Sequence, residues 1–120
     1  MALCICFVLA HACGYRSESL TNVILTHEVS PQPPRVGPLT ITLKATHASG
    51  RPATAAKVNV EANMSHPGMT PVFADAKETA PGRYSSTLEL SMAGDWNFVV
   101  HMSLPDGRKV EYHFDIKGVG

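Results

Sequence analysis

The sequence has no excess of charge of either sign. Lys and Arg together number 10, Asp and Glu also number 10, and the formal net charge at pH 7 is zero. Domains that bind nucleic acid usually carry a surplus of Lys and Arg, because phosphate contacts provide much of their affinity. The composition therefore argues against nucleic acid as a partner.

Cysteine is absent after position 13. The three cysteines are Cys4, Cys6 and Cys13, so the rest of the chain has no thiol pair that could form a disulfide. With 9 glycines, 9 prolines and 44% hydrophobic residues in 120 positions, the chain is also unlike a disordered or collagen-like polymer. We expect one domain that is stabilised by hydrophobic burial alone.

The first 15 residues contain no charged side chain. The apolar run over residues 1–10 is shorter than the roughly 20 residues of a membrane-spanning helix, but has the length of a signal-peptide core. The sequence L-A-H-A-C-G over residues 9–14 resembles a bacterial lipoprotein cleavage box, in which Cys13 becomes the lipidated first residue. A buried N-terminal strand or helix is the alternative.

We therefore interpret residues 1–12 as a lipoprotein-type signal peptide that is cleaved before Cys13, and residues 13–20 as a tether. This interpretation predicts an extracytoplasmic protein of the cell envelope, on the periplasmic side, that is attached to the membrane surface through a lipid anchor. The residues do not decide between a lipid anchor and free secretion.

Helical periodicity is also lacking after residue 20, where short alternating segments are separated by Pro and Gly clusters. These segments predict seven strands, near residues 21–29, 38–47, 56–64, 71–79, 83–91, 95–104 and 109–117. For residues 21–118 this pattern favours an all-β, immunoglobulin-like β-sandwich of about seven strands in two antiparallel sheets. We expect the first, second, fourth and fifth strands in one sheet and the others in the second. A small open barrel is the alternative.

Three motifs in the second half of the chain stand at the ends of these strands. They read N-M-S-H-P-G-M over residues 63–69, P-G-R-Y over residues 81–84 and G-D-W over residues 94–96. Together they resemble the YtkA-like/FixH-like family of bacterial envelope domains. The resemblance implies a membrane-tethered, immunoglobulin-like sandwich outside the cytoplasm, with a link to metal transport or cytochrome oxidase maturation.

The first of these motifs contains potential metal ligands. Met64, His66 and Met69 lie within six positions of each other, on a loop that a Pro-Gly pair forces to turn. Thioether and imidazole groups suit the soft ion Cu(I) better than Mg²⁺ or Ca²⁺, which prefer oxygen ligands. The sequence therefore predicts copper, as Cu(I), as the only cofactor, bound at this loop.

Two further residues could approach the same loop. Met92 lies in the connection between the fifth and sixth strands, and His27 lies near the end of the first strand. There is also a purely structural interpretation. Met64 occupies the same alternating positions as the inward-facing residues of the third strand, and would then fill the core. His27 has the parity of inward residues of the first strand and would then be a partly buried structural histidine.

A second histidine group lies on the last two strands. A tight turn over residues 105–107 would place His101 opposite Glu111, with His113 diagonal to it. Two imidazoles and a carboxylate are ligands for Zn²⁺ or Cu(II). The alternative is an ordinary polar outer face of a hairpin.

The sequence has no recognisable catalytic arrangement. It contains no nucleophile elbow, no Gly-rich phosphate loop and no His-Glu-x-x-His helix, so we expect a protein that is not an enzyme. The sequence predicts a membrane-tethered accessory that binds copper through the Met/His loop and assists metal handling or oxidase assembly, with a membrane transporter or an oxidase assembly factor as partner. The alternative is a metal-free interaction module that docks on a membrane transporter or efflux adaptor, with Met69 and Pro71 as contact residues.

Overall fold

Residues 23–64 and 68–120 are the part of the chain that this computed structural model describes. They form seven strands: β1 (Val23–Ser30), β2 (Gly37–His47), β3 (Lys57–Met64), β4 (Val72–Ala80), β5 (Arg83–Leu90), β6 (Gly94–Ser103) and β7 (Lys109–Val119). Each strand begins and ends within two residues of its predicted boundary. No helix that could span a bilayer is found in this described part. The all-β prediction is confirmed.

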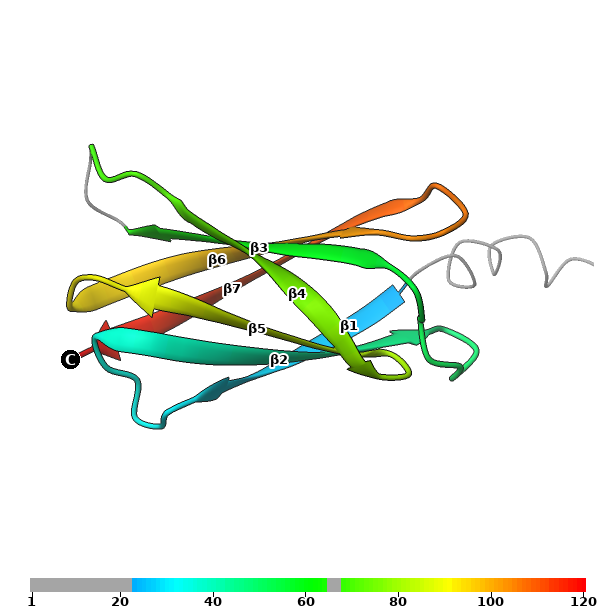
Figure 1. The fold of residues 1–120 in the computed structure, drawn as a ribbon, viewed down its shortest axis with the longest axis horizontal. Helices are drawn as coiled ribbons and strands as arrows, with labels where there is room; N and C mark the ends of the chain where they lie inside the picture. Colours follow the sequence, from blue (N-terminus) through cyan, green and yellow to red (C-terminus); the bar gives the residue numbers. More distant parts are fainter. Residues whose placement is uncertain (1–22, 65–67) are drawn as a thin grey trace, which may run out of the picture.

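The strands form two antiparallel layers that share one strand (Figure 1). The order of hydrogen-bonded neighbours is β1-β2-β5-β4-β3-β6-β7. The first half of β4 pairs with β3, from Val72 opposite Ala62 to Ala76 opposite Val58, whereas its second half pairs with β5 from Lys77 onward. The prediction that the fourth strand belongs to one sheet only is therefore wrong. Two small alanines of β4, Ala74 and Ala76, are half-buried against the core in the half of the strand that pairs with β3.

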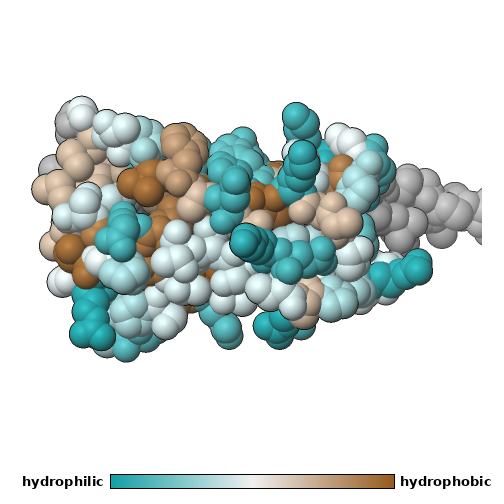
Figure 2. Space-filling model, in the orientation of Figure 1, coloured by the Kyte–Doolittle hydropathy of each residue, from teal (hydrophilic) through white to brown (hydrophobic). Residues whose placement is uncertain are grey.

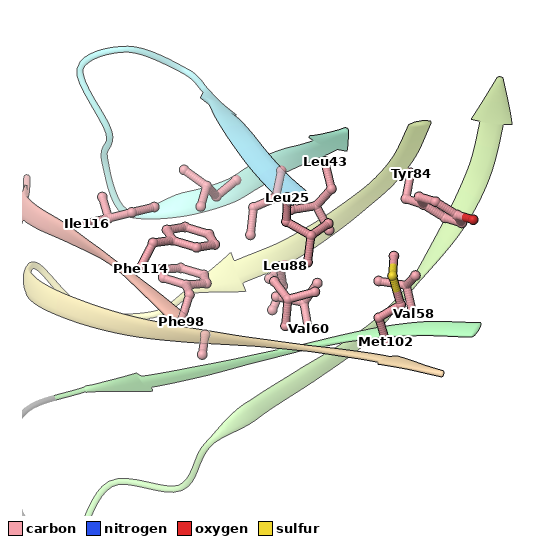
Figure 3. Close-up of a cluster of buried hydrophobic side chains, with 14 of the residues drawn as sticks. Leu25, Leu43, Val58, Val60, Tyr84, Leu88, Phe98, Met102, Phe114 and Ile116 are labelled. Atoms are coloured by element: carbon pink, nitrogen blue, oxygen red, sulfur yellow. The ribbon is translucent and has the colours of Figure 1, made fainter. Parts of the chain in front are cut away.

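The hydrophobic core fills the space between the layers. Figure 3 shows side chains from both sheets pointing into this space, with the rings of Phe98 and Phe114 stacked at a centroid distance of 5.1 Å. The inward face of β6 carries Trp96, Phe98 and Val100, which are each 2% exposed or less. Within the described residues the core extends from Leu25 to Val119.

The sandwich is closed on the side opposite β4 by contacts between β1 and β7. The ring of His27 stacks on Phe114 at 3.8 Å, and its Nδ1 lies 2.6 Å from the Tyr112 hydroxyl. Near the C-terminus, the backbone N–H of Val36 donates to the carbonyl of Gly120 at 3.0 Å. These contacts join the outer strands of the two sheets.

Gly82 in the P-G-R-Y motif holds the β4–β5 turn against β2. Its φ is +74°, and a Cβ at this position would lie 2.8 Å from the carbonyl oxygen of Ala45 and 2.8 Å from the Cβ of Pro52. The backbone N–H of Ala45 donates to the Gly82 carbonyl at 2.8 Å. Only glycine combines this backbone conformation with such a close approach.

Tyr84 in the same motif anchors the β2–β3 loop. Its side chain is fully buried; the hydroxyl donates to the carbonyl of Ala53 at 2.8 Å and accepts from the N–H of Ala56 at 3.1 Å. Burial raises the pKa of this phenol. The P-G-R-Y motif is thus accounted for by the fold.

The two ends of the sandwich differ in their loops. At one end lie the β1–β2 loop, the end of β3, the start of β4 and the β5–β6 turn (Figure 1). At the other end lie the β2–β3 loop, the β4–β5 turn, the β6–β7 turn and Val23, the first residue of β1.

Candidate functional site

The end of the sandwich that carries the β5–β6 turn contains Met64, Met69 and Met92, and we call it the methionine pole. Met64 is the last residue of β3 and is 9% exposed. Its terminal methyl group lies beside Gly94, where an added Cβ would be 3.1 Å from the Met64 Cε. Met64 therefore packs under the β5–β6 turn and belongs to the core cluster.

The other two methionines of this pole reach solvent. Met92 is 44% exposed and Met69 is 36% exposed. The backbone of Met92 is fixed, because its carbonyl accepts a 3.0 Å hydrogen bond from the indole N–H of Trp96. Trp96 itself is buried and pairs with Met64 across β6 and β3. One buried and two accessible thioethers thus come from three separate segments of the chain.

The structure does not bring His27 to the methionine pole. His27 pairs with Leu43, six positions along β2 from Gly37, whose partner Leu90 lies at that pole. Six residues of strand span roughly 20 Å. The prediction that His27 and Met92 approach one place is therefore wrong.

His27 is instead a half-buried structural histidine, held by Tyr112 and Phe114. Burial lowers the pKa of its imidazole below 6.5. The remaining predicted ligand, His66, lies outside the described residues, as does Cys13, the predicted lipidation site.

The second histidine group lies on the outer face of β3, β6 and β7. As predicted, His101 faces Glu111 in the register of β6 and β7, and its Nδ1 lies 3.7 Å from the Glu111 Oε2. His113 Nε2 lies 3.1 Å from Glu111 Oε1. The shortest contact joins His101 Nε2 to Glu61 Oε1 at 2.9 Å. These four side chains form a continuous chain of acid–base contacts.

Glu61 was missed by sequence reasoning. The hydrogen bond from His101 is the main cause that lowers the pKa of Glu61, and a hydrogen bond of 3.0 Å from Asn63 adds to it. Alternation along β3 predicts that the Glu61 side chain points outward. Its place beside His101, however, depends on the pairing of β3 with β6, which cannot be predicted from the sequence.

Between Val23 and Met64 and from Gly68 onward, no group of three or more His, Cys, Asp or Glu side chains is arranged to hold a metal ion. The carboxylates of Glu61 and Glu111 are engaged by imidazoles. The hypothesis of a Zn²⁺ or Cu(II) site at His101, Glu111 and His113 therefore gains no support from the geometry. Thioethers are the remaining soft donors among these residues.

Comparison with solved structures agrees with the sandwich fold. The soluble domain of PmoD from Methylocystis sp. ATCC 49242 (Rockwell) is 15% identical, with a TM-score of 0.51, over 82% of this chain and 90% of that chain. Murine CRIg is 14% identical, with a TM-score of 0.46, over 80% of this chain and 95% of that chain. At 15% identity, the similarity to the PmoD soluble domain shows the fold alone.

Comparison with curated proteins finds no match. The family model described as YtkA-like matches residues 23–101. This range covers more than half of the chain and includes every strand from β1 to β5 and most of β6. The predicted resemblance is confirmed, and the chain belongs to the YtkA-like family.

Proposed function

We propose that this YtkA-like domain is a non-catalytic, membrane-tethered, extracytoplasmic accessory that binds Cu(I) at the methionine pole and assists metal handling or oxidase assembly. One observation carries the proposal: three of the four methionines in the described residues, Met64, Met69 and Met92, lie at one end of the sandwich. The fourth, Met102, is buried on β6, opposite Val58 and Val110.

The donor set at this pole fits a soft monovalent ion. Thioethers bind Cu(I) without a proton to release, because they are neutral at every physiological pH. Met69 and Met92 are accessible, which suits an ion that must pass between partners, and Met64 lies beneath the turn that carries Met92. His66 lies between Met64 and Met69 in the sequence and would add an imidazole.

The proposed extracytoplasmic, membrane-tethered location rests on the N-terminal sequence. The uncharged leader and the cleavage pattern ahead of Cys13 support export and a lipid anchor on the membrane surface. An oxidase under assembly or a membrane transporter would then be the partner that exchanges copper with the exposed methionines.

A second function is favoured by the apolar surface around the same pole. Val36 is 45% exposed and Phe73 is 59% exposed, in addition to the two exposed methionines. Val36 lies in the β1–β2 loop, and Phe73 lies near the start of β4. Such a surface suits a metal-free module that docks on a transporter or efflux adaptor.

A competition titration separates the two functions. The chain from Gly14 to Gly120 is titrated with Cu(I) against a colorimetric chelator under anaerobic, reducing conditions. We expect one ion per chain, and loss of competition in Met64→Leu/Met69→Leu/Met92→Leu, which removes the sulfurs and nearly preserves the volumes.

Met102→Leu is the matched control, because it removes a thioether that lies away from the methionine pole. Its binding should equal that of the wild type. A wild-type chain that does not compete with the chelator contradicts copper binding and leaves the docking function.

A further inference from the structure

Cationic side chains gather at the end of the sandwich opposite the methionine pole. Six of them lie in the connections at that end, in the first residue of a strand there, or directly opposite such a residue: Lys44, Arg51, Lys57, Arg83, Arg108 and Lys109. We call this end the cationic pole. Its carboxylates are Glu78 and Asp106, so six cations against two anions leave a net charge of +4.

The rest of the described residues carries the opposite charge. Three cations remain there against seven carboxylates, a net charge of −4. The carboxylates are Glu28, Glu61, Asp75, Glu89, Asp95, Glu111 and Asp115. Although the net charge of the described residues is zero, positive and negative charges are therefore separated along the long axis of the domain.

Strand pairing fixes the cations in two rows across this end. Lys44 on β2 is directly opposite Arg83 on β5. Lys57 on β3 is opposite Ser103, which is in turn opposite Lys109 on β7. Lys44 and Arg83 lie side by side and repel each other, whereas Lys57 and Lys109 are separated by the width of β6. An anion bound between Lys44 and Arg83 relieves this repulsion.

The two carboxylates of the cationic pole do not neutralise these rows. Asp106 accepts from Arg108 Nε at 2.8 Å. Glu78 is directed to backbone groups, since it accepts from the N–H of Ala55 at 3.0 Å and of Gly82 at 3.1 Å.

The cations of the two rows are exposed and unpaired. Lys44, Lys57, Arg83 and Lys109 have no ion-pair partner among residues 23–64 and 68–120. Their charge is therefore available to an external anion.

The N-terminal part of the chain joins the domain at this same end. Val23, the first residue of β1, pairs with His47, the last residue of β2. Ten residue steps separate Val23 from Cys13, and an extended chain covers at most about 35 Å in that length. A lipid on Cys13 would thus keep the cationic pole close to the bilayer surface.

We infer that the cationic pole docks on anionic phospholipid headgroups and holds the domain upright, with the methionine pole directed away from the membrane. The inference rests on the membrane tether of the proposed function, but not on copper binding. Basic side chains near an anionic bilayer are attracted to it, and salt screens the attraction. Ile24, which is 56% exposed on β1 at this end, adds an apolar contact.

The length of the domain determines how far the exposed methionines would lie from the membrane in this orientation. β2 has 11 residues, which corresponds to a length of roughly 36 Å. Figure 2 shows hydrophilic side chains projecting over the half that carries the cationic pole and more hydrophobic surface toward the other end. The exposed methionines would thus be presented to partners well above the headgroups.

Vesicle sedimentation tests the inference without the leader. The chain from Gly14 to Gly120, which contains every core residue of the described part, is mixed with vesicles of phosphatidylcholine alone or with added phosphatidylglycerol. We expect binding only to the anionic vesicles, and its loss in about 1 M salt, where the Debye length is about 3 Å.

Two charge-matched variants locate the binding surface. Lys57→Gln/Arg83→Gln removes two cations of the cationic pole, and Arg35→Gln/Lys117→Gln removes two from the opposite end. We expect about 30-fold weaker binding for the first variant, from about 1 kcal/mol for each cation removed, and near wild-type binding for the second. Equal weakening in both would overturn the inference, and so would absence of binding to anionic vesicles.

Trp96, the single tryptophan, reports the orientation. It lies at the methionine pole, so a quencher attached to the lipid should leave its fluorescence unchanged in the bound state. Quenching of Trp96 would show that the methionine pole faces the membrane, against the inference. None of these results depends on copper, and a Cu(I) titration that fails leaves them unaffected.

Discussion

The indole N–H of Trp96 donates a hydrogen bond of 3.0 Å to the backbone carbonyl of Met92. Since Trp96 is 2% exposed, this bond connects the hydrophobic core to the turn that presents an exposed methionine. The G-D-W motif thus has a structural role: Gly94 leaves room for the Met64 methyl group, and Trp96 fixes the turn.

Trp96→Phe should loosen the β5–β6 turn as well as destabilise the domain. The substitution removes the donor to Met92 and leaves unfilled volume, for an expected loss of about 2 kcal/mol in the free energy of unfolding. Chemical denaturation measures that loss, and amide exchange of residues 92–94 measures the turn. Phe98→Leu is the control, since it removes volume from the same strand without touching the turn. Equal exchange in the two variants would argue against this role.

Gly82→Ala should be the more damaging of two glycine substitutions in turns. At Gly82 the new Cβ meets the Ala45 carbonyl and Pro52 at 2.8 Å, whereas at Gly107, with φ +96°, nothing lies within 4 Å. Gly107→Ala should cost only the strain of its positive φ, about 1 kcal/mol, and Gly82→Ala about 2 kcal/mol more. Thermal denaturation compares the two. Similar losses would mean that the β4–β5 turn does not press on β2.

His27 should make stability depend on pH in weakly acidic solution. Burial lowers the pKa of His27 in the folded state below its value of 6.5, so the unfolded chain binds more protons between the two values. The free energy of unfolding should therefore fall as the pH drops below 6.5 and stop falling, as far as His27 is concerned, below the folded pKa.

The matched variant for this effect is His27→Phe, which keeps a ring to stack on Phe114. It should have a smaller slope of unfolding free energy against pH in that range, measured by urea denaturation at a series of pH values. The idea would be abandoned if the wild type and His27→Phe had the same slope.

The sequence predicts local features of this fold better than distant ones. A tight turn between two consecutive strands is a local feature, which is why the register of β6 with β7 was predictable, down to His101 opposite Glu111. The turn that sets this register is only a few residues long, and the backbone N–H of Leu104 donates to the Arg108 carbonyl as such a turn requires.

Features that depend on which strands become neighbours were missed. Glu61 and His101 are 40 positions apart, and only the adjacency of β3 and β6 brings them together. The crossing of β4 between sheets depends on two partners at once. His27 was misplaced for a similar reason, because its distance from the methionine pole follows from its register with β2.

Methyl NMR of the methionines tests the central claim most directly. The chain from Gly14 to Gly120, labelled with ¹³C at the methionine methyl groups, contains Met64, Met69, Met92 and Met102. We predict that one equivalent of Cu(I) shifts the methyl signals of Met64, Met69 and Met92 and leaves that of Met102 in place. Unchanged signals at all four positions, or a shift confined to Met102, would contradict copper binding at the methionine pole.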